Sequence, residues 1–265
     1  SVMDIVAGLR LDNYNDTTVF SPRLAFAYKP NIQWTFRTAY GHGFRAPSFM
    51  ESLIDWEHVE FGYSVKGNPD LKPEVSKGIT LGAEYRNNNN FQLSSLFYHN
   101  SFSNLIKDYT LESGVFSYRN IESANFAGIE LISKWIINNS LTSTISVNYL
   151  KNQDSKGNPI PNTMPLSFGG RLSYSPGNQK FLIALNLKGV GEYSPQEYDP
   201  LSEDYIPSST IVDPYLVGDL QIIYRLNPKY KILVGSKNIG NHTNMLYGPY
   251  IGRTAYIEIN TNIER

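Results

Sequence analysis

The side chains best placed to do chemistry in this sequence surround one histidine. His58 stands with Trp56, Phe61 and Tyr63 inside the stretch 55–63. A neutral imidazole is a common metal ligand, and aromatic rings can stack on a planar ligand. The alternative is that His58 is an ordinary polar loop residue. Residue types alone therefore nominate this stretch for ligand binding and leave the role of His58 open.

A second candidate is the acidic, tyrosine-rich stretch 190–213. Between positions 189 and 224 stand seven carboxylates and no Lys or Arg. Such a cluster can hold Ca²⁺ or repel anionic ligands, although acidic runs are more often solvated surface loops. Its tyrosines, Tyr193, Tyr198 and Tyr205, could contact an aromatic ligand.

Catalysis has little support in the sequence. The absence of cysteine removes disulfides, Cys-ligated zinc, iron–sulfur clusters and a thiol nucleophile. Neither a Gly-x-Ser-x-Gly motif nor a phosphate-binding glycine loop is present. The other histidines, His42, His99 and His242, lack the spacing of a zinc site. We therefore predict no catalytic residues, no enzyme cofactor and no enzymatic activity.

The elements that must position these residues are strands. Ile32, Trp34 and Phe36 alternate with polar residues, and the same period of two recurs at 79–86, 141–149, 181–187 and 216–224. Helical spacing persists nowhere for three turns, which predicts an all-β chain. A mean hydropathy of -0.33 with no apolar run of about 18 residues excludes a transmembrane helix. It permits a transmembrane β-barrel, whose strands alternate lipid-facing and lumen-facing residues.

The connections between these strands alternate in length. Short turns are expected at 29–31, 87–90, 138–139, 175–178 and 227–229, and long polar stretches at 44–73, 101–117, 151–165, 190–213 and 240–250. This alternation predicts about twelve antiparallel strands of a membrane barrel with every long loop on one rim. Aromatic residues near the strand ends suit contact with membrane lipid or lipopolysaccharide. A net charge of -1 argues against nucleic acid as a partner.

Two sequence boxes flank the histidine stretch. The first is Phe44-Arg45-Ala46-Pro47, and the second begins Asn68-Pro69-Asp70-Leu71 and continues Lys72-Pro73-Glu74. With the segments 118–120, 127–130, 237–239 and 248–253, in this order and spacing, the chain resembles the C-terminal barrel of TonB-dependent outer-membrane transporters.

The resemblance implies an architecture larger than this chain. Family barrels have 22 strands around a plug domain, whereas the plug and the segment that contacts TonB have no counterpart here. Residues 1–265 are therefore expected to be the C-terminal part of the barrel domain, with the remainder cleaved, outside this sequence or on a separate chain. The last four residues, 262–265, also lack the aromatic end expected of an outer-membrane barrel, which predicts a trimmed terminus.

The function that the resemblance implies is TonB-dependent uptake of a scarce iron-containing nutrient, haem or a ferric siderophore, across the outer membrane of a Gram-negative bacterium. The TonB complex would act through the missing plug region, and a surface lipoprotein is a further candidate partner. His58 would ligate iron if the ligand is haem. Trp56, Phe61, Tyr63 and Tyr198 would contact the ligand, while the two boxes are expected to order the long loop rather than touch ligand.

Three other functions stay open at this point. The same fold could take up cobalamin or another nutrient. The chain could also belong to a passive porin or an adhesin barrel, in which case uptake would persist without TonB. The third alternative is a soluble carbohydrate-binding β domain, which would not need detergent for extraction.

Overall fold

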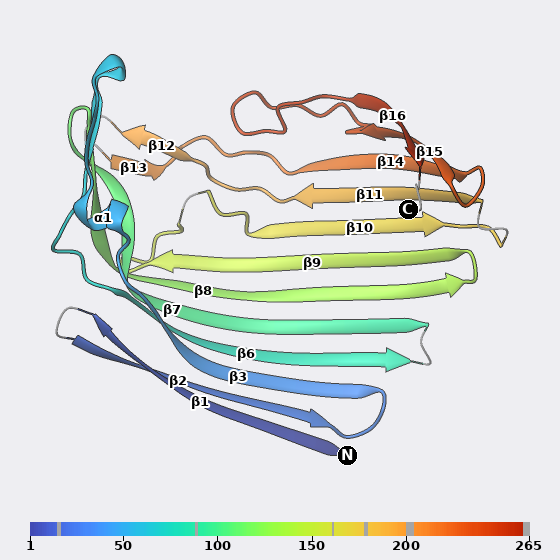
Figure 1. Ribbon diagram of the computed structural model, residues 1–265, viewed down its shortest axis with the longest axis horizontal. Coiled ribbons are helices and arrows are strands. Elements are labelled where there is room, and N and C mark those ends of the chain that lie inside the picture. Colours follow the sequence, from blue (N-terminus) through green and yellow to red (C-terminus); the bar gives the residue numbers. More distant parts are fainter. Residues whose placement is uncertain (15–16, 88–89, 161, 178–179, 200–203, 262–265) are drawn as a thin grey trace.

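The chain forms one large, curved, antiparallel sheet (Figure 1). The computed structural model describes residues 1–14, 17–87, 90–160, 162–177, 180–199 and 204–261. Within this part the sheet order is β1 (Val2–Tyr14), β2 (Thr17–Lys29), β3 (Trp34–Arg45), β6 (Glu74–Asn87), β7 (Phe91–Glu112), β8 (Val115–Asn138), β9 (Leu141–Asp154), β10 (Leu166–Tyr174), β11 (Phe181–Val190), β14 (Tyr215–Arg225), β15 (Tyr230–Lys237) and β16 (Thr254–Thr261). These twelve strands confirm the all-β prediction.

The smaller elements gather at one end of the strands, on the left in Figure 1. They are α1 (Phe49–Leu53), β4 (Asp55–His58), η1 (Val59–Phe61), β5 (Tyr63–Lys66), β12 (Gln196–Asp199) and β13 (Asp204–Pro207). We call this end the outer rim and the opposite end, with the short turns, the inner rim. Within the described residues, no helix is long and apolar enough to cross a membrane.

Asparagine side chains build the inner-rim turns at Asn31, Asn138 and Asn227. The side-chain oxygen of Asn31 accepts hydrogen bonds from the backbone N–H groups of the residues two and three positions later, both at 2.9 Å. Asn138 and Asn227 make the same pair of bonds at 2.9 and 3.0 Å. Asparagine satisfies a tight turn locally in this way, which is why the sequence located these turns correctly.

The apolar faces of the strands are exposed rather than packed in a protein core. Ile145 is 46% exposed and Tyr149 is 51% exposed, although both lie on the apolar face that alternation predicted. Buried hydrophobic side chains in the described residues are few and scattered: Leu71, Ala124, Ala184, Val190, Tyr193, Val212 and Leu233. A single sheet with an uncovered apolar face needs lipid in place of a second protein layer.

The opposite face carries paired charges. Arg37 on β3 donates to Glu84 on β6 at 3.1 Å, and Gln92 on β7 donates to the same carboxylate at 3.2 Å. Arg171 on β10 donates to Asn186 on β11 at 3.1 Å. Charged and amide groups in mid-strand are characteristic of the polar interior of a transmembrane barrel. This face is therefore the lumen side.

Aromatic rings line the apolar face near the inner rim. Trp34 stacks on Phe36 with ring centroids 5.5 Å apart and lies 4.8 Å from Tyr85. The row continues through Phe91 to Trp135, with 6.4 Å between successive ring centroids. Rings of this kind suit a membrane interface because they are apolar and still tolerate contact with water.

One predicted loop is wrong. Residues 101–117 are not a long loop, because β7 and β8 continue through them and meet at a two-residue turn containing Gly114, whose φ is +76°. The stretch is polar since this part of the hairpin extends past the membrane-spanning region, where no apolar face is required. Likewise, β3 continues to Arg45 and β9 to Asp154, inside stretches expected to be loops.

The twelve strands leave the sheet open. β1 and β16 are its two edges, and within the described residues each pairs on one side only. Figure 1 shows the N-terminus at the inner rim. The chain therefore supplies a contiguous set of barrel strands and does not close a barrel within itself.

Candidate functional site

Residues 46–73 fold into a compact body at the outer rim, which we call the outer lobe. It begins with α1, whose N-cap is Ser48. The Ser48 hydroxyl accepts from the Glu51 backbone N–H at 3.3 Å, and the Glu51 carboxylate accepts from the Ser48 backbone N–H at 2.7 Å. This capping box satisfies the free backbone donors of so short a helix. The sequence signal was Ser-x-x-Glu, and the sequence reasoning missed it.

Arg45, in the first box, ties the outer lobe to the barrel. Its guanidinium donates to both oxygens of Glu74 at 2.6 and 2.7 Å, and to both oxygens of Glu51 at 2.8 and 3.0 Å. The Arg45 side chain is 46% exposed, whereas the two carboxylates are 16% and 12% exposed. Hydrogen bonding from Arg45 lowers the pKa of the Glu51 carboxyl to about 2. One arginine thus joins α1 to the ends of β3 and β6.

The second box fastens the other end of the lobe to β8. The Asn68 side chain donates to the Tyr118 carbonyl at 2.9 Å. Asn120 accepts from the Lys72 backbone N–H at 2.8 Å and donates to the Lys72 carbonyl at 2.9 Å. Leu71 is buried between these bonds, at 6% exposure. Each of these hydrogen bonds has a backbone group as one partner, so the residue types alone could not predict the pairing.

The other residues of the two boxes limit the backbone. Pro47 precedes α1, and Pro69 fixes φ next to Asn68. The Asp70 N–H donates to the Asn68 side chain at 2.9 Å, which makes a local turn. Phe44 packs edge-on against Tyr14 of β1, with centroids 6.4 Å apart. Ala46 is the first residue after β3.

The aromatic residues singled out in the sequence come together in the hairpin β4–η1–β5. The His58 ring lies 4.5 Å from Phe61, 5.1 Å from Trp56 and 5.4 Å from Tyr63, measured between centroids. Tyr63 also contacts Phe116 of β8 at 6.0 Å. Trp56 and Phe61 are exposed, at 44% and 72%. We call these four residues the aromatic hairpin; it presents rings to solvent at the outer rim.

The hairpin is held by β8. Val65 of β5 pairs in parallel with Phe116, and the Ser64 N–H donates to the Gly114 carbonyl at 2.8 Å. The long extension of β7 and β8 is therefore the support on which the aromatic hairpin stands. Sequence reasoning missed this support because it assigned residues 101–117 to a loop.

The acidic stretch forms a separate hairpin, β12–β13. The Tyr198 backbone lies in β12, and its side chain is outside the described residues. Glu197 accepts from the Ser208 hydroxyl at 2.6 Å and from the Ser209 N–H at 3.2 Å, so this carboxylate is engaged within the protein. Among the described residues no three His, Cys, Asp or Glu side chains gather as metal ligands. Glu203 lies outside the described residues.

A small cavity of about 240 Å³ separates this acidic stretch from the β9–β10 connection. Asn152, Ile160 and Ile211 are among its lining residues. Tyr193 also lines it and packs with Val190 and Val212 in the main buried cluster of the described residues. Burial raises the pKa of the Tyr193 phenol. The outer rim therefore contains both this cavity and the exposed aromatic hairpin.

The remaining histidines lie apart from the aromatic hairpin. His42 Nε2 is 2.7 Å from the Tyr40 hydroxyl at the outer end of β3. His242 stacks on Tyr215 with centroids 4.9 Å apart, in the connection before β16. His99 lies within β7. Among the described residues His58 is the histidine that contacts three aromatic rings, of Trp56, Phe61 and Tyr63, whereas His42 contacts the exposed ring of Tyr40.

The sheet and its outer rim define an outer-membrane β-barrel with an elaborated loop lobe. The chain belongs to the TonB-dependent receptor family, because residues 3–239 match the family model described as "TonB dependent receptor-like, beta-barrel". The sequence resemblance is thereby confirmed, as is the expected location in the outer membrane.

Named relatives share part of the sequence. The chain is 29% identical over 224 residues to the iron-regulated outer membrane virulence protein of Vibrio cholerae serotype O1. The aligned region covers 78% of this chain and 34% of the relative. It is 28% identical over 186 residues to transferrin-binding protein A of Neisseria meningitidis serogroup B, which covers 57% of this chain and 19% of that protein. The chain thus spans about a third of the length of its first relatives.

Solved structures share the fold. The ferric enterobactin receptor of Pseudomonas aeruginosa, in complex with enterobactin, superposes with a TM-score of 0.80 at 18% identity, over 98% of this chain and 43% of that one. The siderophore receptor PirA from Acinetobacter baumannii gives 0.79 at 16% identity, again over 98% and 43%. At such identities the likeness concerns the fold alone.

Proposed function

We propose that residues 1–265 are the C-terminal part of the barrel domain of a TonB-dependent receptor that takes up a ferric chelate. The observation that carries the proposal is the aromatic hairpin, held at the outer rim by two family boxes above a polar lumen. The names of the relatives, an iron-regulated outer-membrane protein and siderophore receptors, support iron as the cargo. Transport without catalysis is part of the proposal.

In this proposal each part of the outer rim has a separate task. Trp56, Phe61 and Tyr63 make the first contact with the chelate, and Tyr198 contacts it from the acidic hairpin. The boxes around Arg45 and Asn68 hold the lobe and do not touch the ligand, because their polar atoms are already bonded to protein groups. TonB acts through a plug region beyond this chain, and lipid or lipopolysaccharide covers the apolar face.

We propose a ferric chelate rather than haem. A histidine that ligates iron usually has its second ring nitrogen hydrogen-bonded, which fixes the ring. No such bond to the His58 ring occurs among the described residues, whose contacts with it are aromatic. Titration of the full receptor with haemin tests the choice. A Soret shift that disappears in His58→Ala and persists in His99→Ala would restore haem.

Uptake of labelled iron tests the transport proposal. Cells that produce the full receptor should accumulate ⁵⁵Fe from a chelate only when TonB is present, and Trp56→Ala combined with Phe61→Ala should reduce uptake several-fold. Ile32→Ala, at an exposed inner-rim position, is the matched control. Uptake that continues without TonB would indicate a passive porin, whereas uptake of cobalamin but not iron would replace the cargo. The exposed apolar face already disfavours a soluble carbohydrate-binding domain.

A further inference from the structure

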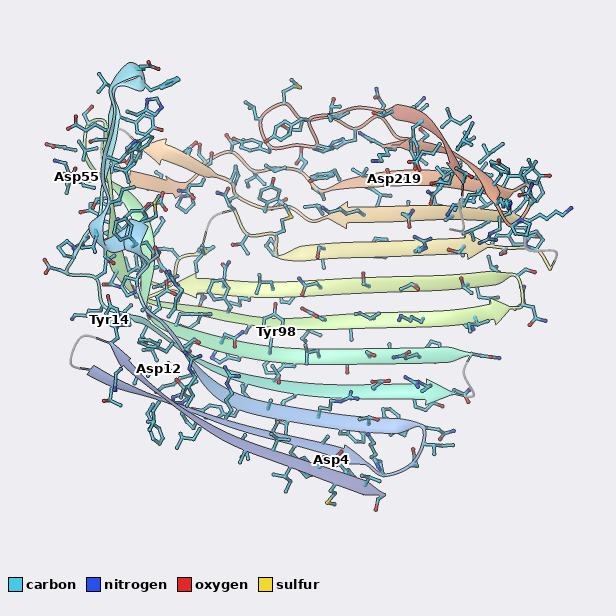
Figure 2. The ribbon with its side chains drawn as sticks, viewed as in Figure 1. Asp4, Asp12, Tyr14, Asp55, Tyr98 and Asp219 are labelled. Atoms are coloured by element: carbon cyan, nitrogen blue, oxygen red, sulfur yellow. The ribbon has the colours of Figure 1, made fainter. Side chains whose placement is uncertain are left out.

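The hairpin that carries the aromatic residues has two chemically different faces. Residues that alternate along a strand point to opposite sides. Trp56 and His58 therefore share one face, together with their partners Val65 and Tyr63, while Asp55 and Glu57 share the other. An aromatic surface and a row of carboxylates are thus presented by the same short element at the outer rim, where Figure 2 shows Asp55.

The carboxylates of this hairpin remain largely uncompensated. Asp55, Glu57 and Glu60 are all exposed. Asp55 lies opposite Lys66 in the strand register, so its charge has a neighbour. Among the ion pairs of the described residues, none includes Glu57 or Glu60. Glu57 is on the face opposite Trp56 and His58, and Glu60 lies in η1 next to Phe61 in the chain, so both negative charges belong to the hairpin that a ligand would meet first.

The arginine nearest to the lobe offers no compensation. Arg45 is bonded to two carboxylates, Glu51 and Glu74, and together the three groups carry a net negative charge. An anionic chelate would have to displace one of these carboxylates to gain a bond with this guanidinium. The Arg45 guanidinium is therefore already paired with two carboxylates of the protein.

The predicted outer connections are also rich in acidic residues. Of the chain's 23 basic and 24 acidic residues, the stretches 46–73, 155–165, 191–214 and 238–253 contain four basic and eleven acidic ones. The rest of the chain is consequently net positive, although the whole is almost neutral. A concentration of one sign around an entrance sets the potential that an approaching ligand experiences.

We infer that Glu57 and Glu60 determine specificity by charge, so that the receptor captures a neutral or positively charged ferric chelate and rejects polyanionic ones. The inference rests on the proposed function, since it names the class of chelate that the aromatic hairpin takes. A hydroxamate-type ferric chelate has the required charge and apolar surface. A ferric tris-catecholate, with three negative charges, has the wrong charge.

Binding of three probes to the full receptor in detergent tests this inference. The probes are a neutral ferric trihydroxamate, a cationic linear ferric trihydroxamate and an anionic ferric tris-catecholate. Quenching of the receptor's tryptophan fluorescence measures the binding of each probe. At low ionic strength the two hydroxamates should bind at least about tenfold more tightly than the tris-catecholate. At about 0.5 M salt this gap should narrow, because exposed charges are screened.

A charge-neutral variant and a matched control locate the effect. Glu57→Gln with Glu60→Gln should tighten tris-catecholate binding several-fold and leave the neutral trihydroxamate unchanged. Asp4→Asn with Glu258→Gln makes the same change in total charge on β1 and β16, away from the outer lobe, and should alter neither affinity. Tightest binding of the tris-catecholate, or equal effects of both variants, would overturn the inference. Binding of none of the three probes would overturn the proposed function itself.

Discussion

At the scale of single residues, Arg45 is one anchor of the outer lobe. Its guanidinium closes a bridge between two carboxylates that are mostly shielded from solvent, and hydrogen bonds to charged groups contribute about 1.5–3 kcal/mol each in proteins. Replacing Arg45 removes both bridges at once and leaves two neighbouring carboxylates without their cation. Arg45 therefore affects ligand capture by holding the outer lobe in place and not by touching the ligand.

We expect Arg45→Met to lower amide hydrogen-exchange protection of residues 46–73 by at least tenfold while the barrel strands keep theirs. The reason is that α1 and β6 lose their common anchor. Arg253→Met, at an exposed position in another outer connection, should leave the lobe protected. Unchanged protection in Arg45→Met would show that the second box is enough to hold the lobe.

The same bridge predicts a dependence on pH. Because the pKa of Glu51 is lowered to about 2 from an ordinary value of 4.5, its contribution to stability is complete above pH 4.5 and is lost as the pH falls towards 2. Fluorescence of Trp56, in a variant with Trp34 and Trp135 replaced by Phe, should be constant from pH 7 to 5 and change below 4.5. Glu51→Gln should abolish this transition; its persistence there would assign the transition to another group.

At the scale of elements, the β7–β8 hairpin supports the aromatic hairpin. Asn120 on β8 makes two bonds to Lys72 and a third to the Asn104 carbonyl at 2.6 Å. One side chain therefore connects the second box to both strands of the support. The lobe and the extended hairpin should consequently loosen together.

We expect Asn120→Ala to increase protease cleavage within residues 46–73 several-fold, since two hydrogen bonds between the lobe and its support are lost, together with a third within the support. Asn244→Ala is the matched control, because its side chain caps a turn in a different outer connection. Limited proteolysis of the folded receptor, followed by mass spectrometry, measures the difference. Equal cleavage in both variants would mean that backbone pairing of β5 with β8 suffices.

At the scale of the whole molecule, the uncovered apolar face is the main feature. Ile145 projects from it, and the neighbouring Thr144 lies opposite Arg171 on the lumen side. Ile145 lies within β9 on the lipid-facing side, so a charge there would face the hydrocarbon layer. The bilayer therefore completes the structure in the way that a protein core does elsewhere.

Ile145→Lys should reduce the free energy of unfolding in lipid bilayers by about 2–4 kcal/mol, the cost of a lipid-facing Lys near the midplane. Thr144→Lys, one residue away on the lumen face, should have a much smaller effect. Urea unfolding of the full receptor in lipid vesicles provides the measurement. Similar costs for both variants would contradict the assignment of the two faces.

Most strands, the inner turns and the family boxes could be predicted from the sequence, because each depends on local information. Period-two alternation marks the faces of a strand, and residues such as Asn31 and Asn138 build a turn from their own side chains. The sequence also brought His58, Trp56, Phe61 and Tyr63 forward as one group, since they are neighbours along the chain.

How those elements work together depends on contacts between residues far apart in the sequence. The apolar face of a sheet is buried if a second protein layer packs on it and exposed if none does. The alternation of apolar and polar residues in the sequence is the same in both cases. The bridge from Arg45 to Glu74 joins residues 29 positions apart, and the Asn120 bonds to Lys72 join residues 48 apart. Outside the membrane, polar strands of β7 and β8 pair without an apolar face, so hydrophobic periodicity could not reveal the support on which the aromatic hairpin stands.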